Sequence, residues 1–214
     1  MQLPQSWGSA RATLVIAGTT AALWLIVWIL RLEGYAALWG GFIPARVSGR
    51  IEDVVLAPVF LTPLTATLVH SGLVHLAFNL VVLLFCGRSI EPILGRAGLV
   101  ILYLVGAYVS AAAEYFVNPN NVVPMIGASG AISAVLGAYA MLFGRNKVKV
   151  ASPALALALH VLWLAAAWIA LQLLVGFAFV PSGTNGIAVF AHIGGFIAGI
   201  ALARPLLLLR WRGA

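Results

Sequence analysis

Two residues with the chemistry of a nucleophile and a base stand in apolar stretches of the chain. Ser129 lies between Gly127 and Gly130, at the start of an uncharged run that ends at Gly144. His192 lies near the start of the last long apolar run. A serine hydroxyl is a weak nucleophile until a neighbouring base takes its proton, and histidine is the usual base. Ser129 alone could simply cap a helix, so the interpretation depends on what else lies near it.

More polar residues occur in the segment HSGLVHLAFN. His75 and Asn79 are four positions apart, which places them on one face of a helix, and His70 precedes them. Polar groups within a membrane are costly and usually face the interior of the bundle or a water-filled cavity. His75, Asn79 and the backbone N–H of Ser129 could therefore donate hydrogen bonds to a developing oxyanion.

No carboxylate is placed to orient His192. The five acidic residues all lie outside the three apolar runs that carry these polar groups: Glu33, Glu52, Asp53, Glu91 and Glu114. We therefore expect a Ser–His dyad in place of a Ser–His–Asp triad. A zinc site built from His70, His75 and His192 lacks both a carboxylate and an H-E-x-x-H motif, so neither a metal nor a cofactor is expected.

The composition indicates a membrane protein. The chain has 214 residues, of which 63% are hydrophobic and 8% are charged, with a mean hydropathy of +1.09. We expect one all-α polytopic membrane domain over residues 1–214, a six-helix bundle around a central helix of small residues. The predicted spans are residues 12–30, 72–90, 97–113, 127–144, 153–180 and 187–203, with an interfacial loop over residues 32–71.

The charge distribution predicts the orientation in the membrane. Of the 12 Lys and Arg residues, only Arg31, Arg46 and Arg50 fall on the side opposite the termini. By the positive-inside rule both termini are then cytoplasmic, and the cell (inner) membrane is the expected location. The net charge of +7 is scattered among the loops, so it does not indicate nucleic-acid binding. The spans at 72–90, 127–144 and 187–203 should all begin at the outer face.

Small residues predict which helices meet. Ser133 and Gly137 share a helical face with Ser129, and Gly195 and Gly199 share one with His192. Stripes of small residues allow two helix backbones to approach closely. Contact between these two stripes would bring Ser129 to His192.

The motifs resemble those of the rhomboid family of intramembrane serine proteases, over nearly the whole chain. The family's two histidines and asparagine appear in HSGLVHLAFN, its glycine-any-serine-glycine motif at Gly127–Gly130, and its alanine-histidine pair at Ala191–His192. The resemblance implies peptide-bond hydrolysis in or beside transmembrane segments of other proteins, with lipid around the enzyme. It assigns Ser129 as nucleophile, His192 as base, and His75, Asn79 and the Ser129 amide as the oxyanion hole. Residues in supporting positions are His70, Gly127, Gly130, Ser133, Gly195 and Gly199.

Two positions depart from the family pattern. Many members have tryptophan-arginine in the first loop, where this chain has Leu61 and Thr62. Many members carry an aromatic residue one turn after the nucleophile, against the base, whereas this chain has Ser133. Something else must then orient His192. Two other functions remain open: a catalytically inactive relative that binds membrane clients, and a histidine-dependent proton or cation transporter. A transporter predicts internal repeats or acidic residues at the midplane, neither of which is found, and the oligomeric state is open.

Overall fold

The computed structural model describes residues 7–51, 57–143, 152–179 and 188–212, and these form an all-helical fold. Four helices of this part are long and apolar enough to cross a membrane. They are α1 (Arg11–Ile29), α5 (Leu73–Val117), α7 (Pro153–Phe179, with its candidate span at Pro153–Ala170) and α8 (Val189–Arg210). Helix α6 (Ser129–Phe143) is apolar but has only 15 residues. The predicted count of six spanning helices is therefore not confirmed as such.

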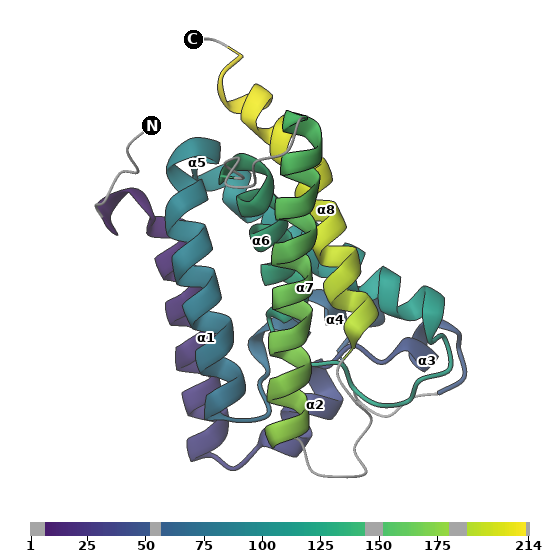
Figure 1. The fold of residues 1–214 in the computed structure, drawn as a ribbon. Coiled ribbons are helices and arrows are strands. Elements are labelled where there is room, and N and C mark those ends of the chain that lie inside the picture. Colours follow the sequence, from purple (N-terminus) through teal and green to yellow (C-terminus); the bar gives the residue numbers. More distant parts are fainter. Residues whose placement is uncertain (1–6, 52–56, 144–151, 180–187, 213–214) are drawn as a thin grey trace.

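Helix α5 joins two predicted spans into one bent element of 45 residues. The bend falls at Gly95, whose φ of +76° is readily adopted only by glycine. Pro92 lies inside the same helix, although the sequence predicted a break between residues 90 and 97. The two halves diverge from the bend, the first beside α1 and the second descending on the far side of the molecule (Figure 1).

A buried carboxylate fixes the start of α1 against α5. Glu91 accepts hydrogen bonds from the backbone N–H groups of Ala12 and Thr13, both at 2.8 Å, and from the Thr13 hydroxyl at 2.7 Å. The first N–H groups of a helix lack intrahelical acceptors, and a negative charge there is favourable. Glu91 thereby caps a helix whose own N-cap residue, Ala10, provides no side-chain acceptor.

The predicted interfacial loop is, in its described part, a series of short helical turns. These are α2 (Glu33–Gly40), α3 (Pro44–Val47), η2 (Val59–Leu61), α4 (Thr62–Thr65) and η3 (Ala66–Leu68). Pro44 and Pro63 stand in the first turns of α3 and α4, where the missing N–H costs nothing. Backbone bonds between Phe42 and Met125, at 2.9 and 2.8 Å, tie this region to the segment that leads into α6.

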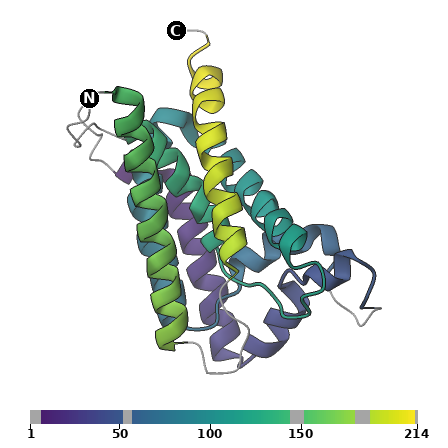
Figure 2. The same cartoon turned by 45° about the vertical axis from the view of Figure 1, so that its right-hand side comes forward.

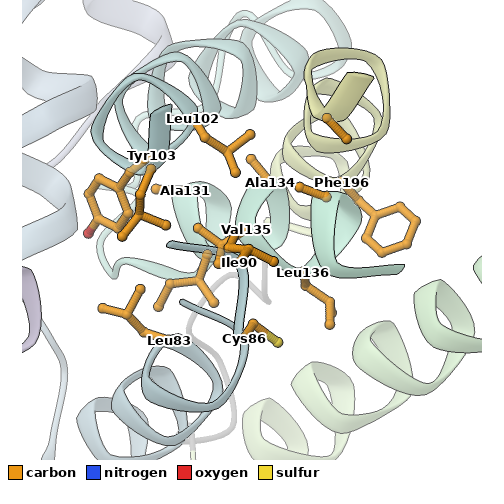
Figure 3. Packing of buried hydrophobic residues seen from close by; sticks show 14 of the residues in the cluster. Leu83, Cys86, Ile90, Leu102, Tyr103, Ala131, Ala134, Val135, Leu136 and Phe196 are labelled. Atoms are coloured by element: carbon orange, nitrogen blue, oxygen red, sulfur yellow. The ribbon is translucent and has the colours of Figure 1, made fainter. Parts of the chain in front are cut away.

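Helix α6 forms the centre of the fold. Every residue from Ser129 to Ala138 is buried, and Figure 3 shows Ala131, Ala134 and Val135 between side chains of α5 and α8. A Cβ on Gly199 would overlap the carbonyl oxygen of Ala134, and one on Gly137 would overlap that of Phe196. The backbones of α6 and α8 are thus in direct contact, as the small-residue stripes predicted.

The helices that carry the catalytic candidates run in the same direction. Helices α6 and α8 and the first half of α5 all run toward the end where the first and last described segments lie (Figures 1 and 2). Helix α7 runs antiparallel to α8 along the outside of the bundle. The sequence predicted that the spans at 72–90, 127–144 and 187–203 begin on the same side of the membrane, and the directions of these helices agree with that prediction.

The helix boundaries differ from the predictions mainly at the end of α8. It continues through Pro205 to Arg210, whereas the sequence predicted an end at residue 203. Pro205 is exposed while Leu206 is buried in the core, so packing holds the helix despite the missing hydrogen bond. The predicted boundary residues Gly144, Val180 and Ile187 lie outside the described residues.

Candidate active site

Ser129 and His192 are in direct contact. The Oγ of Ser129 lies 2.8 Å from Nε2 of His192, and the two residues are only 7% and 4% exposed. Ser129 is the first residue of α6, and His192 lies in the first turn of α8. A hydrogen bond of this length allows the hydroxyl proton to pass to the imidazole, so the pair has the geometry of a nucleophile with its base.

Backbone contact near the pair explains the short distance. A Cβ on Gly195 would overlap the carbonyl oxygen of Gly130, one residue after Ser129. A Cβ on Gly130 would lie 2.7 Å from both Cβ and Oγ of Ser110, on the second half of α5. Side chains at either glycine would push the helices apart, so these two predicted supporting residues act by allowing close approach.

The segment before Ser129 requires a glycine at position 127. Gly127 has a φ of +112°, and a Cβ there would lie 2.6 Å from Nε2 of His75 and 3.8 Å from Oγ of Ser129. The Nδ1 of His75 lies 3.1 Å from the Ser71 hydroxyl. When that hydroxyl donates to Nδ1, Nε2 carries the ring proton. His75 then presents an N–H donor beside Ser129.

Asn79 lies one turn after His75 and is completely buried. Its Nδ2 donates to the backbone carbonyl of His75 at 2.8 Å, and its Oδ1 has no hydrogen-bond partner among the described residues. An amide nitrogen carries two N–H groups. One is used within the helix, which leaves the amide with a second N–H.

His70 supports the same segment from the connection before α5. Its Nε2 accepts a long hydrogen bond of 3.4 Å from the backbone N–H of Ala128, and its ring meets that of His75 edge-on at 5.0 Å. Burial, together with the neighbouring His75, lowers the pKa of His70 to about 3. A neutral imidazole can accept this bond, so His70 helps to hold the backbone that precedes Ser129.

Neither buried carboxylate of the described part contacts His192. Glu91 binds the start of α1, and Glu114 accepts a hydrogen bond from Asn118 at 2.8 Å. The Nδ1 of His192 is buried and has no hydrogen-bond partner among the described residues. The ring of Trp168 instead packs beside His192, with centroids 6.3 Å apart and planes inclined by 61°.

Sequence reasoning missed three residues around the pair. They are Trp168, Ser71 and Ser110, none of which belongs to the motifs that the sequence offers. Ser110 could have been found from its spacing, because Gly106 and Ser110 continue a stripe of small residues on α5 that faces α6. The described part of the chain contains no group of three or more His, Cys, Asp and Glu side chains that could hold a metal ion.

Comparison with known proteins identifies the family. A family model described as the Rhomboid domain matches residues 59–209. This match covers more than half of the chain, and the chain therefore belongs to the rhomboid family. Together with the four apolar helices, this makes it an integral membrane protein.

Several curated relatives carry rhomboid names. "Rhomboid-type serine protease 2" of Emericella nidulans is 32% identical over 163 residues, which cover 72% of this chain and 28% of that protein. "RHOMBOID-like protein 4" of Arabidopsis thaliana is 29% identical over 152 residues, covering 68% of this chain and 34% of that protein. "Rhomboid protease GlpG" of Pectobacterium atrosepticum is 30% identical over 138 residues, covering 64% and 45%. The chain thus spans less than half the length of each, and the family-level function they support is intramembrane proteolysis.

Proposed function

We propose that this chain is an intramembrane serine endopeptidase that cleaves transmembrane or juxtamembrane segments of other membrane proteins. The observation that carries the proposal is the 2.8 Å contact between Oγ of Ser129 and Nε2 of His192, both buried at the start of apolar helices. A serine that only capped α6 would need no imidazole on its hydroxyl. Membership of a family whose relatives are named proteases supports the same function.

The proposed reaction proceeds through an acyl-enzyme. Oγ of Ser129 attacks the carbonyl carbon of the scissile bond while its proton passes to Nε2 of His192. His192 then returns this proton to the leaving amide nitrogen, and the C–N bond breaks. A water molecule, deprotonated by His192, attacks the ester, and Ser129 recovers its proton as the acid product leaves. No cofactor takes part in these steps.

The charge on the substrate oxygen needs donors next to Ser129. The N–H of Ser129 is in the first turn of α6, where backbone N–H groups have no intrahelical acceptor. His75 and Asn79 add side-chain donors from α5. The partial positive charge of the helix N-terminus favours the same oxyanion.

Replacing Asn79 by alanine is expected to lower kcat by up to about 10²-fold, because one donor is lost while two remain. KM should change little, since the oxyanion forms only in the transition state. Steady-state cleavage of a model substrate measures both constants, and a thermal unfolding scan shows whether the loss of the bond to the His75 carbonyl destabilises the helix. An unchanged kcat would remove Asn79 from the oxyanion hole.

The orientation of the protein determines where it cuts. We propose that both termini are cytoplasmic in the cell membrane, because nine of the 12 basic residues then lie inside and only Arg31, Arg46 and Arg50 lie outside. Ser129 then lies toward the outer face. A spanning substrate helix has its carbonyls bonded internally, so it must unwind locally before attack.

Helix α7 is the proposed gate for the substrate. Of the α7 side chains that the structure describes, only Ala156 and Trp168 are buried, whereas the glycine-lined faces of α6 and α8 are in backbone contact. A helix with so few buried side chains can move away at low cost compared with α6 or α8. Its displacement would open the bundle sideways to a helix in the lipid.

A single-span model substrate tests the function directly. Purified protein in detergent or liposomes is expected to cut it in the outer part of the span or just outside, where glycine and other weak helix formers ease unwinding. Replacing the outer small residues of the substrate by leucine should slow the cut, which mass spectrometry can locate. The same replacements at the cytoplasmic end serve as the control and should have little effect.

Three outcomes would count against these proposals. Cleavage at the cytoplasmic end would contradict the orientation, and indifference to the outer leucines would contradict the need for unwinding. Stable binding of the substrate without any cleavage would favour the inactive, client-binding alternative.

A further inference from the structure

The imidazole of His192 lacks the usual means of orientation. A catalytic histidine is normally held by an acceptor at its second ring nitrogen, and Nδ1 of His192 has no hydrogen-bond partner among the described residues. The contact with Ser129 fixes only the Nε2 end of the ring. The orientation of the ring plane must therefore come from what packs beside it.

Trp168 packs beside His192 and is itself held at a fixed position. Its Nε1 donates a hydrogen bond of 2.6 Å to Oγ of Ser133. Ser133 in turn donates to the backbone carbonyl of Ser129 at 2.7 Å. Ser129, His192, Trp168 and Ser133 thus form a closed ring of contacts, with the indole at 6.3 Å and 61° to the imidazole.

We propose that Trp168 is a positioning residue for the base His192, and that it couples the docking of α7 to the orientation of the dyad. Trp168 is 4% exposed and is the largest buried side chain among those described on α7. Aromatic rings in an inclined, edge-to-face arrangement attract one another beyond their buried area. The inference rests on the proposed function, because it concerns the same serine and histidine.

A purely structural role for Trp168 makes a different prediction. If the indole only filled space, any apolar side chain of similar size would serve equally well once the protein was folded. If the ring orients His192, an aromatic replacement should keep the reactivity of Ser129, and an aliphatic one of similar volume should not. Both Trp168→Phe and Trp168→Leu remove the hydrogen bond to Ser133. A difference in labelling rate between these two variants therefore reports the effect of the aromatic ring alone.

The test measures the rate at which a small fluorophosphonate labels Ser129 in the full chain, together with kcat and KM on the model substrate. Trp168→Phe is expected to stay within about threefold of the unsubstituted protein. Trp168→Leu is expected to lower both the labelling rate and kcat by about tenfold, the scale on which losing an aromatic pair acts. KM should be unchanged or lower, since a less firmly docked α7 admits substrate more easily. Thermal scans identify the folded variants, and Trp168→Met replaces the leucine variant if the latter does not fold.

The outcomes separate this inference from the proposed function. Labelling of the unsubstituted protein with equal rates for the phenylalanine and leucine variants would overturn the role of Trp168 and leave the dyad standing. A labelling rate in Trp168→Leu at or above that of the unsubstituted protein would also overturn the role of Trp168 and leave the dyad standing. Absence of labelling in the unsubstituted protein would overturn the proposed function and this inference with it.

Discussion

Ser129→Ala is expected to abolish both peptide cleavage and labelling by a fluorophosphonate while the fold survives. The substitution removes the oxygen atom that attacks the scissile carbonyl, and loss of the nucleophile or its base in a serine hydrolase lowers kcat by about 10⁶-fold. The neighbouring hydrogen bond from Ser133 ends on the backbone carbonyl of Ser129, which alanine retains. Loss of a helix cap would cost about 1 kcal/mol, so the thermal midpoint should move by only a few degrees.

His192→Ala should behave in the same way, because the Ser129 hydroxyl then keeps its proton. His160 provides the control, since it lies on the half of α7 nearer the chain's first and last described segments. His160→Ala should leave activity near normal. Full cleavage by Ser129→Ala would refute the nucleophile, and rapid labelling of Ser129 in His192→Ala would refute the dyad.

Gly199→Ala is expected to cause the second large loss. A Cβ at this position would overlap the carbonyl oxygen of Ala134 and lie 2.7 and 2.8 Å from its carbonyl carbon and Cα. Backbone atoms cannot rotate away as a flexible side chain can, so α8 must shift from α6. Overpacking of this kind lowers the free energy of unfolding by about 1–3 kcal/mol. A displacement of about 1 Å in a reacting group can cost about 10²-fold in rate.

Gly18→Ala is the matched control. Gly18 also lies in a predicted spanning helix, but nothing lies within 4 Å of a Cβ built on it. Alanine there should be neutral or slightly stabilising. Thermal unfolding in detergent and the labelling rate of Ser129 measure both variants. An unchanged midpoint and an unchanged rate in Gly199→Ala would show that α6 and α8 need no direct contact.

The meeting of α6 with α8 could be predicted from the sequence because it depends on residue size alone. Gly195 and Gly199 follow His192 by three and seven residues on one helical face, and such spacing has few explanations other than a close helix contact. The contact between Ser129 and His192 follows from this spacing and from helix direction. Their catalytic roles remain predictions until the variants above are measured.

The short helices between α1 and α5 could not be predicted with the same method. Helices α3 and α4 have only four residues each, too few to show a period, and are held by contacts distant in sequence. One such contact is the hydrogen bond from the Ala45 N–H of α3 to the Asn121 carbonyl at 3.0 Å. The residues next to these short helices in the sequence do not indicate which distant residue will bind them.

Trp168 was missed for a related reason. Helix α7 is apolar on all sides, so no stripe of small or polar residues marks which face meets the bundle. The absence of an aromatic residue at Ser133 indicated that another group must orient His192, but nothing in the sequence named it. Only the three-dimensional arrangement brings residues 133, 168 and 192 together.

If α7 both admits the substrate and steadies His192, as proposed above, it cannot do both at once. While α7 was displaced, Trp168 would be away from His192, and a segment that had entered would meet a slow enzyme. Cleavage would then require α7 to return with the segment still in place. A segment that diffused out sooner would escape intact, whereas one that stayed longer would be cut. The choice of substrate among the many helices of a membrane would thus depend on how long a segment stays beside Ser129, as well as on the residues around the scissile bond.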